Sequence, residues 1–524
     1  MSVTAAGSAS EGRRATGLDR LVHRQLDSYP DTGPRTLFLA ITVLATIMLY
    51  YELYVAGSVS TLILPSLHMS FTFFVTTLAF GNLIGAFGSL FAGITDRLGR
   101  CNLVVVGLLI TGVMTAFVLP AATNKWAFTI EGFAVGLVEG ICLVATPALI
   151  RDFSPQVGRA TAMGFWTTGP VVGSLVVAVV GSNTITATTQ WPHEYRICGI
   201  AGLVVFVLCA IGMRELSPGL RDQLMVSTRD RALIEARAKG LDIEASLRQP
   251  FRQLLKPDVI ISAFGVAVFL LVYYTAVGFS VIYLSTIFGK TLKDANGLGN
   301  WNWGFNVIAV VLVGLISDKL RVRKPLMVLG AIGAIVMLII YLERAGHPNT
   351  GYYTLAIMLA LLSFFLGVAY CPWMASFTET VEARNPALTA TGLAIWGWII
   401  RVVVFVAYLV LPVVVTSVTP LVNYGAQVQT AATKYKTSIA FAQTHPKVIA
   451  TAQSIAPELA AVSAHATLFT QLSAHPTPAL IAQAQAAVGP TLFKQILADQ
   501  AKIKAVIPYA PQLTALQAAT KDPN

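Results

Sequence analysis

Long apolar segments separated by short polar ones dominate the first 418 residues. A helix that crosses the hydrocarbon core of a bilayer needs about 20 predominantly apolar residues. Eleven segments approach that requirement, and they predict membrane-spanning helices at about 36–57, 69–94, 102–120, 126–150, 158–181, 196–213, 258–286, 301–317, 325–342, 352–377 and 388–418. Residues 1–35 are polar and carry no apolar core, so we expect the first helix to serve as an uncleaved insertion signal.

The composition supports the same class of protein. Charged residues make up 12% of the chain and hydrophobic residues 55%, whereas soluble domains carry about 25% charged residues. The five cysteines fall inside predicted helices or at one edge of them, and no spacing of Cys and His suggests a zinc site. We therefore expect an all-α polytopic membrane protein with no metal site, and we do not expect an enzyme.

The distribution of Lys and Arg between the predicted helices sets the expected orientation. With the N-terminus inside, the outer loops hold only Lys125, Arg196, Lys290, Lys293 and Arg344, and the remaining basic residues of the helix-bearing region lie on the cytoplasmic side. This asymmetry predicts a multi-pass protein of the cytoplasmic membrane with a cytoplasmic N-terminus. The formal net charge of +11 is explained by this topology, and we expect no nucleic-acid partner.

One short charged motif occurs twice, each time between two apolar segments. The first copy is Gly93-Ile94-Thr95-Asp96-Arg97-Leu98-Gly99-Arg100, and the second is Gly314-Leu315-Ile316-Ser317-Asp318-Lys319-Leu320-Arg321. The two aspartates stand roughly six spanning helices apart, which indicates two related halves, as in many secondary transporters. In the second copy Lys319 replaces arginine, and Val322 stands near the place where a glycine is expected.

These motifs resemble the signature loop of the major facilitator superfamily. The resemblance covers about residues 36–418 and implies two pseudo-symmetric six-helix bundles that alternate access to a central site. It also implies a gate formed by the loop residues: Gly93, Asp96, Arg97, Gly99 and Arg100 in the first copy, and Asp318, Lys319 and Arg321 as a weaker second copy. Since only eleven spans are visible, the twelfth helix of the family is missing from the prediction.

Segments outside the spans complete the predicted organisation. Residues 1–35 form a cytoplasmic tail, 36–213 the first bundle, 214–257 a central loop with an amphipathic helix, and 258–418 the second bundle. Residues 419–524 are rich in Ala and Gln, with helical periodicity at 448–472 and 478–507. Either they form an extracytoplasmic helical extension, or they are an enlarged outer loop whose following helix is absent from this chain.

Four ionisable side chains lie inside predicted spans, where charge is costly and function is a common reason for it. Tyr50-Tyr51-Glu52-Leu53-Tyr54 resembles the Gly-Tyr-Asp region of proton-coupled metabolite transporters, so we nominate Glu52 for proton coupling, with Glu139 and Glu131 as further candidates. A structural hydrogen bond is the alternative for Glu52 and for Glu139. Arg401 lies deep in the last predicted helix and either binds an anionic substrate or pairs with a glutamate.

Other polar and aromatic side chains in the spans are weaker candidates for substrate contact, since aromatic residues in membrane helices mostly pack. These candidates are Tyr273, Tyr274, Asn302, Asn306, Trp166, Tyr370 and Trp373. Gly169-Pro170-Val171-Val172-Gly173 resembles a Gly-Pro motif of proton-linked exporters, and its glycines permit close helix packing.

The sequence therefore predicts a secondary active transporter, with proton-coupled movement of a small organic acid as the first hypothesis. The proton gradient would take the place of a cofactor, and the partners would be a small-molecule substrate and the bilayer, with the protein as a monomer. A proton/drug antiporter is the first alternative, and a transporter-like membrane sensor is the second.

Overall fold

The computed structural model describes residues 24–90, 99–154, 166–220, 255–384, 389–416 and 418–521. Three features predicted from the sequence lie wholly or mostly outside these residues: Gly93, Asp96 and Arg97 of the first motif, the start of the predicted span 158–181, and the amphipathic helix of the central loop. The chain divides into two compact units, Met1–Asn423 and Tyr424–Asn524, and each is described by itself.

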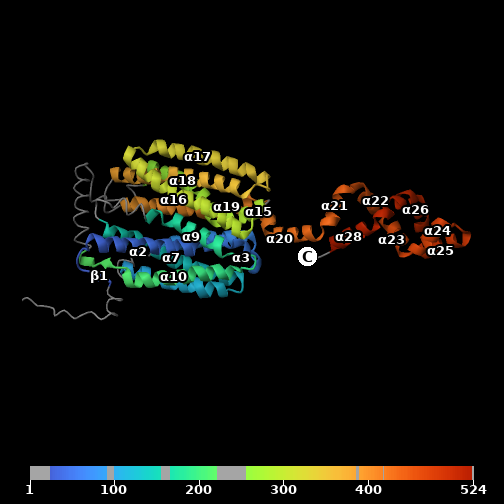
Figure 1. Cartoon of the computed structure of the whole chain (residues 1–524), viewed down its shortest axis with the longest axis horizontal. Coiled ribbons are helices and arrows are strands. Elements are labelled where there is room, and N and C mark those ends of the chain that lie inside the picture. Colours follow the sequence, from blue (N-terminus) through green and yellow to red (C-terminus); the bar gives the residue numbers. More distant parts are fainter. Residues whose placement is uncertain are drawn as a thin grey trace, which may run out of the picture. The chain divides into compact units, whose positions relative to one another are not determined.

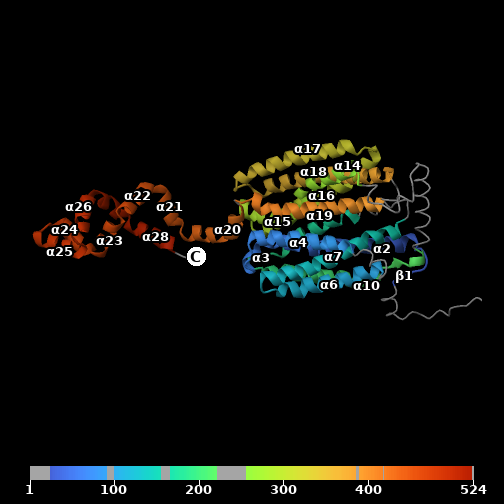
Figure 2. The same ribbon diagram turned by 180° about the vertical axis from the view of Figure 1, so that it is seen from behind.

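The first unit is a bundle of helices in two sequential halves. The helices of the first half are α2 (Thr32–Ser58), α3 (Ser60–Ser66), α4 (Phe71–Leu90), α6 (Arg100–Val113), α7 (Lys125–Phe153), α9 (Gly169–Thr184) and α10 (Trp191–Gly212). Those of the second half are α14 (Pro257–Phe269), α15 (Leu271–Phe288), α16 (Leu292–Leu320), α17 (Lys324–Glu343), α18 (Tyr352–Arg384) and α19 (Thr389–Val414). Figure 1 shows the two halves lying side by side, and Figure 2 shows the same arrangement from behind.

These helices confirm the predicted class of an all-α, multi-pass membrane protein. Ten helical segments in the described part of the chain are long and apolar enough to cross a bilayer, and α9 is a shorter apolar helix. Each of the eleven predicted spans overlaps a helix. The span predicted at 258–286 is divided at Leu270 into α14 and α15, and the third span ends in a π-helical turn at Met114–Val118. Such π-turns are often found at functional sites.

Glycines allow helices of the first half to approach closely. A Cβ atom on Gly140 of α7 would collide with the backbone of Gly85 in α4, and one on Gly88 would lie 2.6 Å from the carbonyl oxygen of Leu137. Close approach through small residues is a common way for membrane helices to associate, because lipid leaves little hydrophobic drive between them. Gly85 and Gly140 thus define the α4–α7 contact.

We name the two ends of the bundle by residues, the Ser58 end and the opposite Arg100 end. At the Arg100 end, Gln25–Leu26 (β1) pair in parallel with Glu215–Leu216 (β2). The adjacent Arg24 is buried and donates to Asn102 and to the carbonyl of Ala210. The segment before the first helix is therefore fastened to the segment that follows α10.

The second unit consists of short helices in a ten-residue rhythm. α21 (Lys436–Thr444), α22 (Pro446–Ser454), α23 (Ala456–Ala464) and α24 (Ala466–Ala474) have nine residues each, and single residues separate them. The chain returns through α25 (Pro478–Val488), α26 (Pro490–Ala498), α27 (Gln500–Val506) and α28 (Ala510–Lys521). A linking helix, α20 (Val418–Lys434), precedes them.

The returning helices pack on the outgoing ones in reverse order, α24 with α25, α23 with α26, α22 with α27 and α21 with α28. Ile455, Ile496, Ile503 and Val506 form the core between the two rows. The predicted helical segments 448–472 and 478–507 are helical, as expected, but each is several short helices. The broken pattern follows the repeat of one apolar residue every ten positions, as in Ile439, Ile449, Leu459 and Phe469.

Candidate functional site

Five tyrosines and one arginine gather in the middle of the first unit, between its two halves. Tyr50 and Tyr54 lie one turn apart on α2, Tyr273 and Tyr274 lie on α15, and Tyr370 lies on α18. The hydroxyl of Tyr370 interacts electrostatically with those of Tyr50, Tyr273 and Tyr274, and the hydroxyl of Tyr54 interacts with the same three. All five side chains are partly buried, and four of them (Tyr54, Tyr273, Tyr274 and Tyr370) pack against the apolar core.

Arg401 completes this cluster from the middle of α19. Its guanidinium interacts electrostatically with the hydroxyls of Tyr50 and Tyr274. The Tyr408 hydroxyl, also on α19, donates a 2.7 Å hydrogen bond to the backbone carbonyl of Tyr274 and so holds α15 beside α19. A cationic side chain and five phenol rings from both halves thus share one region, which we call the Arg401 cluster (Arg401, Tyr50, Tyr54, Tyr273, Tyr274 and Tyr370).

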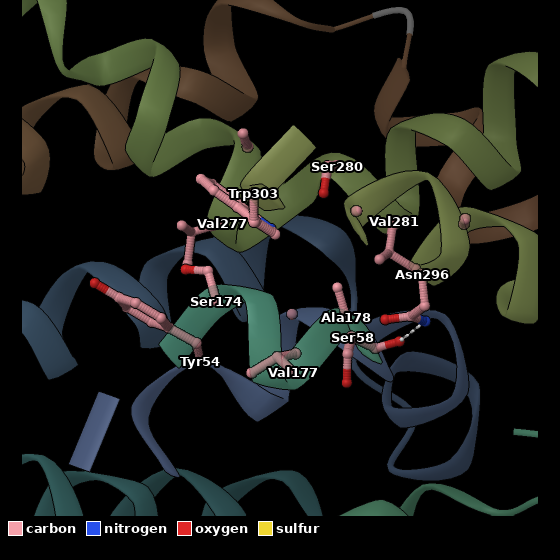
Figure 3. Close-up of a pocket in the computed structure, with 14 residues that line it drawn as sticks. Tyr54, Ser58, Ser174, Val177, Ala178, Val277, Ser280, Val281, Asn296 and Trp303 are labelled. Carbon is pink, nitrogen blue, oxygen red and sulfur yellow. Dashed lines mark hydrogen bonds between the residues drawn. The ribbon is translucent and has the colours of Figure 1, made fainter. Parts of the chain in front are cut away.

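A small pocket adjoins the cluster toward the Ser58 end (Figure 3). Tyr54, Ser58 and Ser174 line it from the first half, and Asn296 and Trp303 line it from the second. The pocket has a volume of about 30 Å³, which is room for about one water molecule. The two halves are therefore nearly in contact at this level of the bundle.

Hydrogen bonds and close packing join the halves at the Ser58 end. Asn296 on α16 donates to the carbonyl of Ser58, and Asn300 one turn later donates to the hydroxyl of Ser182, both at 3.0 Å. A Cβ atom on Gly57 would collide with the carbonyl of Val277. In this conformation the Ser58 end is closed.

Glu52 points away from the Arg401 cluster, because it lies on the opposite face of α2 from Tyr50 and Tyr54. Its carboxyl faces Gly202 of α10 so closely that a Cβ atom there would collide with it. The Thr111 hydroxyl lies beside it, although the two oxygens do not meet the geometry of a full hydrogen bond. Glu52 is therefore buried inside the first half, where it is 4% exposed.

Glu139 connects the interior of the first half to the cluster. Its side chain is 1% exposed, and it interacts electrostatically with Glu52 on one side and with Tyr50 on the other. Neither carboxyl oxygen has a hydrogen-bond partner among the described residues. Glu131 lies two turns toward the Ser58 end and is only partly buried, so Glu52 and Glu139 are the pair that the fold brings together.

Glu194 is a further buried carboxyl that the sequence analysis did not single out. It lies on the first turn of α10, is 2% exposed, and accepts a 2.7 Å hydrogen bond from Thr184. Cys198, one turn along α10, interacts electrostatically with Glu194, Glu52 and Glu139. Nothing in the sequence was a reason to nominate Glu194, since a glutamate in the first turn of a helix is common.

The remaining nominated residues divide between the cluster and the packing of single halves. Trp373 stacks on Tyr370 with ring centroids 6.3 Å apart and donates to Ser262. Asn306 donates to the backbone and side-chain oxygens of Ser363 within the second half, and its neighbour Asn302 is also buried. Trp166 donates to Thr146 of α7.

The Gly-Pro motif of α9 packs against α2 and so helps to position Tyr50 of the cluster. A Cβ atom on Gly173 would lie 2.7 Å from the Cβ of Tyr50, and one on Gly169 would lie 2.9 Å from Thr46. Pro170 takes an early position in α9, where its missing N–H costs nothing. The two glycines thus let α9 press on the face of α2 that carries Tyr50.

The second charged motif forms an ion-pair network at the Arg100 end. Arg323 donates to Asp318 at 2.7 Å and to Glu379 of α18 at 3.0 Å. Partial burial acts to lower the pKa of Arg323, but these two carboxylates outweigh it and leave that pKa raised. Arg321 has a left-handed backbone with φ of 54°, so Arg321, and not Val322 as expected from the sequence, occupies the position of the motif's glycine.

The described part of the first motif also has a positive φ at its glycine and an ion pair at the Arg100 end. Gly99 has φ of +90°, and Arg100 makes two 2.8 Å hydrogen bonds to the carboxylate of Asp152 at the end of α7. Glu215 accepts from the backbone N–H of Arg100 at 2.8 Å and so caps the start of α6. Both positions therefore have a positive φ, but their ψ angles are 128° at Gly99 and 32° at Arg321, so the two turns differ.

A family model provides the deciding comparison. The model of the Major Facilitator Superfamily matches residues 42–408. This chain belongs to the Major Facilitator Superfamily. Members of this superfamily are transporters, and the match covers both halves of the bundle and both charged motifs, which confirms the family and the fold expected from the sequence.

Individual relatives of this family member are distant. Human "Sugar phosphate exchanger 3" is 24% identical over 56% of this chain and 62% of its own length. An "MFS-type efflux pump" of Mycolicibacterium smegmatis is 24% identical over 68% of this chain and 80% of its own length. The mouse "Probable small intestine urate exporter" is 23% identical over 49% of this chain and 50% of its own length. The chain thus spans only about half to two thirds of several relatives.

Solved structures agree with the fold. A bacterial homologue of the human lysosomal transporter Spinster aligns over 94% of this chain and all of that chain, with a TM-score of 0.55 and 16% identity. The xylose transporter XylE from E. coli aligns over 72% of this chain and 92% of that chain, with a TM-score of 0.54 and 17% identity. At these identities the likeness concerns the fold alone.

Proposed function

We propose that this protein moves a small organic anion across the membrane by alternating access and couples that movement to protons. The observation that carries the proposal is the Arg401 cluster, in which a guanidinium in the middle of a spanning helix meets residues of both halves. Arginine remains charged at every relevant pH and recognises carboxylates well. A ligand bound there touches both halves and can influence how they rock.

The names of several relatives support an anionic substrate. The relatives include exchangers of sugar phosphate and probable exporters of urate, both of which are organic anions. We assign the closed Ser58 end to the outer face, in agreement with the expected cytoplasmic N-terminus. The cluster is then sealed from outside in the present conformation.

Glu52 and Glu139 are the proposed proton carriers. A buried carboxyl changes strongly in energy when it gains or loses its charge, and Glu139 lies between Glu52 and Tyr50 of the cluster. Protonation of this pair therefore changes the electrostatic potential at the proposed substrate site. Uptake follows if both solutes bind from outside and leave inside, which is the direction we propose.

A proton/drug antiporter is the second candidate. Two relatives, "Multidrug resistance protein MdtL" of Shewanella oneidensis and the efflux pump of M. smegmatis, favour it. The aromatic walls of the cluster also suit lipophilic cations, which bind tyrosine faces. In that case Arg401 would have a structural role.

Ligand-induced thermal stabilisation distinguishes the two candidates. Purified protein would be heated with organic acids, sugar phosphates, sugars and cationic drugs, since a ligand that binds the native state raises its stability. Stabilisation by organic anions that is lost in Arg401→Ala and partly kept in Arg401→Lys supports the proposal. Arg196→Ala, at an exposed arginine of α10, is the control. Stabilisation by cations alone, unchanged in Arg401→Ala, would establish the antiporter instead.

A further inference from the structure

We propose that protons reach Glu52 through the interior of the first half, and that Glu194 is the residue at which they enter from the Ser58 end. The inference rests on the proposed proton coupling, to which it adds a third carboxyl and a path. The path lies within the first half, apart from the contact between the halves. We call it the Glu194 route, and its residues are Glu194, Cys198, Tyr51, Thr115, Thr111 and Glu52.

Glu194 is a buried carboxyl beside a group that contacts solvent. It lies on the first turn of α10 and is 2% exposed. Trp191, at the start of the same helix, donates a 3.0 Å hydrogen bond to Ser66 of α3, which places this end of α10 at the Ser58 end. The neighbouring His193 is exposed and interacts electrostatically with the Glu194 carboxyl. A proton taken up from solution by His193 is therefore close to Glu194.

Thr184 allows Glu194 to be hydrogen-bonded in either protonation state. The Thr184 hydroxyl lies 2.7 Å from the Glu194 carboxyl and 2.7 Å from the backbone carbonyl of Val180. A hydroxyl has one proton to donate and two lone pairs that accept. Thr184 donates to the carboxyl when Glu194 is ionised. When Glu194 is protonated, it donates to Thr184, which turns its own proton to the carbonyl. Glu194 thus gains and loses a proton without losing this bond.

Three buried hydroxyls of the first half have no hydrogen-bond partner among the described residues. They belong to Tyr51, Thr111 and Thr115. Other threonines of the same half, such as Thr42 and Thr46, donate to the carbonyl four residues earlier in their own helix, which is a common arrangement in helices. Buried polar groups that have no protein partner are usually bonded to water. These three hydroxyls are therefore suited to hold water and to pass protons.

The packing of α10 aligns these groups between the two carboxyls. Glu194, Cys198 and Gly202 follow one another at successive turns of α10, and Glu52 faces Gly202. The eight residues from Glu194 to Gly202 correspond to about 12 Å along the helix. Cys198 interacts electrostatically with both glutamates, and Tyr51 interacts with Glu194 and Cys198. The interval between the carboxyls is thus lined by groups that can take part in hydrogen bonds.

The π-helical turn at Met114–Val118 brings the two threonines to the same interval. A Cβ atom on Gly199 of α10 would collide with the backbone of Ala116 in this turn, so the turn and α10 are in direct contact. Thr115 belongs to the turn, and Thr111 lies one turn earlier, beside Glu52. Since α6 runs from Arg100 toward the Ser58 end, the two hydroxyls extend from the level of Glu52 toward that of Glu194.

Transfer along the Glu194 route moves one proton and changes nothing else. Glu194 accepts a proton and donates it to a hydroxyl or a water molecule of the route, and each oxygen in turn accepts one proton and releases another. Glu52 ends protonated, and Glu194 returns to the carboxylate. The charged and titratable groups that face Glu194, Glu52 and Glu139 come from α2, α7 and α10, and they include Tyr50, Tyr51, His193, Tyr195, Cys142 and Cys198.

The test follows hydrogen–deuterium exchange of the Glu52 carboxyl in the full-length protein, with no substrate present. The C=O stretching band of a protonated carboxyl shifts when deuterium replaces the proton, and Glu52→Gln identifies the band by removing it. Rapid mixing of the purified protein with D2O buffer gives the exchange rate from infrared spectra. We expect Glu194→Gln to lower this rate about tenfold, which corresponds to a barrier higher by about 1.4 kcal/mol.

Further variants separate a relay from a structural role of Glu194. Glu194→Asp keeps a carboxyl and is expected to restore part of the rate. Thr184→Val keeps Glu194 but removes its hydroxyl partner, so it should slow exchange to a smaller extent, and it provides the measurement if Glu194→Gln does not fold. Glu343→Gln, at an exposed glutamate that ends α17, is the matched control and should exchange at the wild-type rate.

Several outcomes would overturn the inference. Exchange that is as fast in Glu194→Gln as in the wild type would show that the route is wrong, while the proposed coupling through Glu52 and Glu139 would stand. Slowing by Glu139→Gln instead would mean that protons arrive through the Arg401 cluster. Protection of the band by Na⁺ and not by K⁺ would assign Glu52 to a metal ion. A Glu52 carboxyl that is ionised at every pH at which the protein is folded would refute both the route and the proposed proton coupling.

Discussion

The side-chain nitrogen of Asn296 donates a 3.0 Å hydrogen bond to the backbone carbonyl of Ser58, and this bond links the two halves of the first unit. The carbonyl at the end of α2 has no successor in that helix to bond, so an amide from the other half satisfies it. Gly181 leaves room for the Asn296 side chain, which lies 2.9 Å from the position of a Cβ atom there. Under the proposed alternating access, this contact would have to break in every cycle.

Replacement of Asn296 by alanine is expected to shift the protein toward the state in which the Ser58 end is open. A buried hydrogen bond contributes about 1 kcal/mol net, so the equilibrium between closed and open states should change about fivefold. Double electron–electron resonance would measure the distance between a spin label on α3 and one at the start of α16. The distance distribution gives the populations of the closed and the open state.

Asn82→Ala is the matched control for that experiment. The amide of Asn82 bonds Leu78 of its own helix at 3.0 Å, so its removal is expected to leave the distance distribution unchanged. Equal shifts in both variants would mean that asparagine loss acts through general stability, and the Asn296 contact would then have no gating role.

Gly57→Val is expected to prevent closure of the Ser58 end altogether. Any Cβ atom at this position collides with the backbone carbonyl of Val277, and a backbone cannot yield as a side chain can. The protein should fold, because the obstruction exists only when the halves meet. Spin-label distances should show a single open population, and transport should be lost.

Gly265→Val tests whether valine itself is harmful in a helix of this bundle. No heavy atom lies within 4 Å of the position of a Cβ atom on Gly265, so this variant should retain both populations. A closed population in Gly57→Val that matches the wild type would refute the steric argument.

The sequence predicted the helices well because membrane spans depend on local composition. An apolar run of sufficient length has to be helical in lipid, since every backbone group must be bonded within the segment. Arg401, Tyr273, Tyr274 and Tyr370 were nominated from their positions in such runs, and the fold brings them together. Tyr50 was not nominated, because the segment around it was interpreted through its ionisable residue, Glu52.

The sequence did not predict which neighbouring helix each side chain faces. Glu52 and Tyr50 are two residues apart, so they had to lie on different faces of α2, but the sequence did not say which face meets the other half. Asn296 and Asn300 were missed because their partners, Ser58 and Ser182, are more than a hundred residues away. Such contacts depend on tertiary packing, and only a three-dimensional arrangement shows them.

Gly140→Ala is expected to destabilise the first half of the bundle. The added methyl group would collide with the backbone of Gly85, and overpacking of a tight contact costs about 1–3 kcal/mol. Thermal unfolding in detergent should therefore begin at a lower temperature than in the wild type.

Gly132→Ala on the same helix provides the control. Nothing lies within 4 Å of its Cβ position, and alanine is a better helix former than glycine by about 1 kcal/mol. This variant is expected to unfold at the wild-type temperature or slightly above it. A Gly140→Ala protein that is as stable as Gly132→Ala would show that α4 and α7 separate without cost.

The ten-residue rhythm of the second unit predicts where that unit is sensitive. Ile503 of α27 is 5% exposed in the core between the two rows of helices, whereas Leu497 of α26 is 53% exposed. Ile503→Ala removes buried methyl groups and is expected to cost about 3 kcal/mol, while Leu497→Ala should stay within about 0.5 kcal/mol of the wild type.

Hydrogen exchange of the full-length protein measures both effects, because amide protection in residues 436–521 reports the stability of this unit. We expect faster exchange throughout both rows in Ile503→Ala, since each outgoing helix depends on a returning one. Faster exchange confined to α27 would show instead that the repeats fold one by one, and the paired rows would not be a cooperative unit.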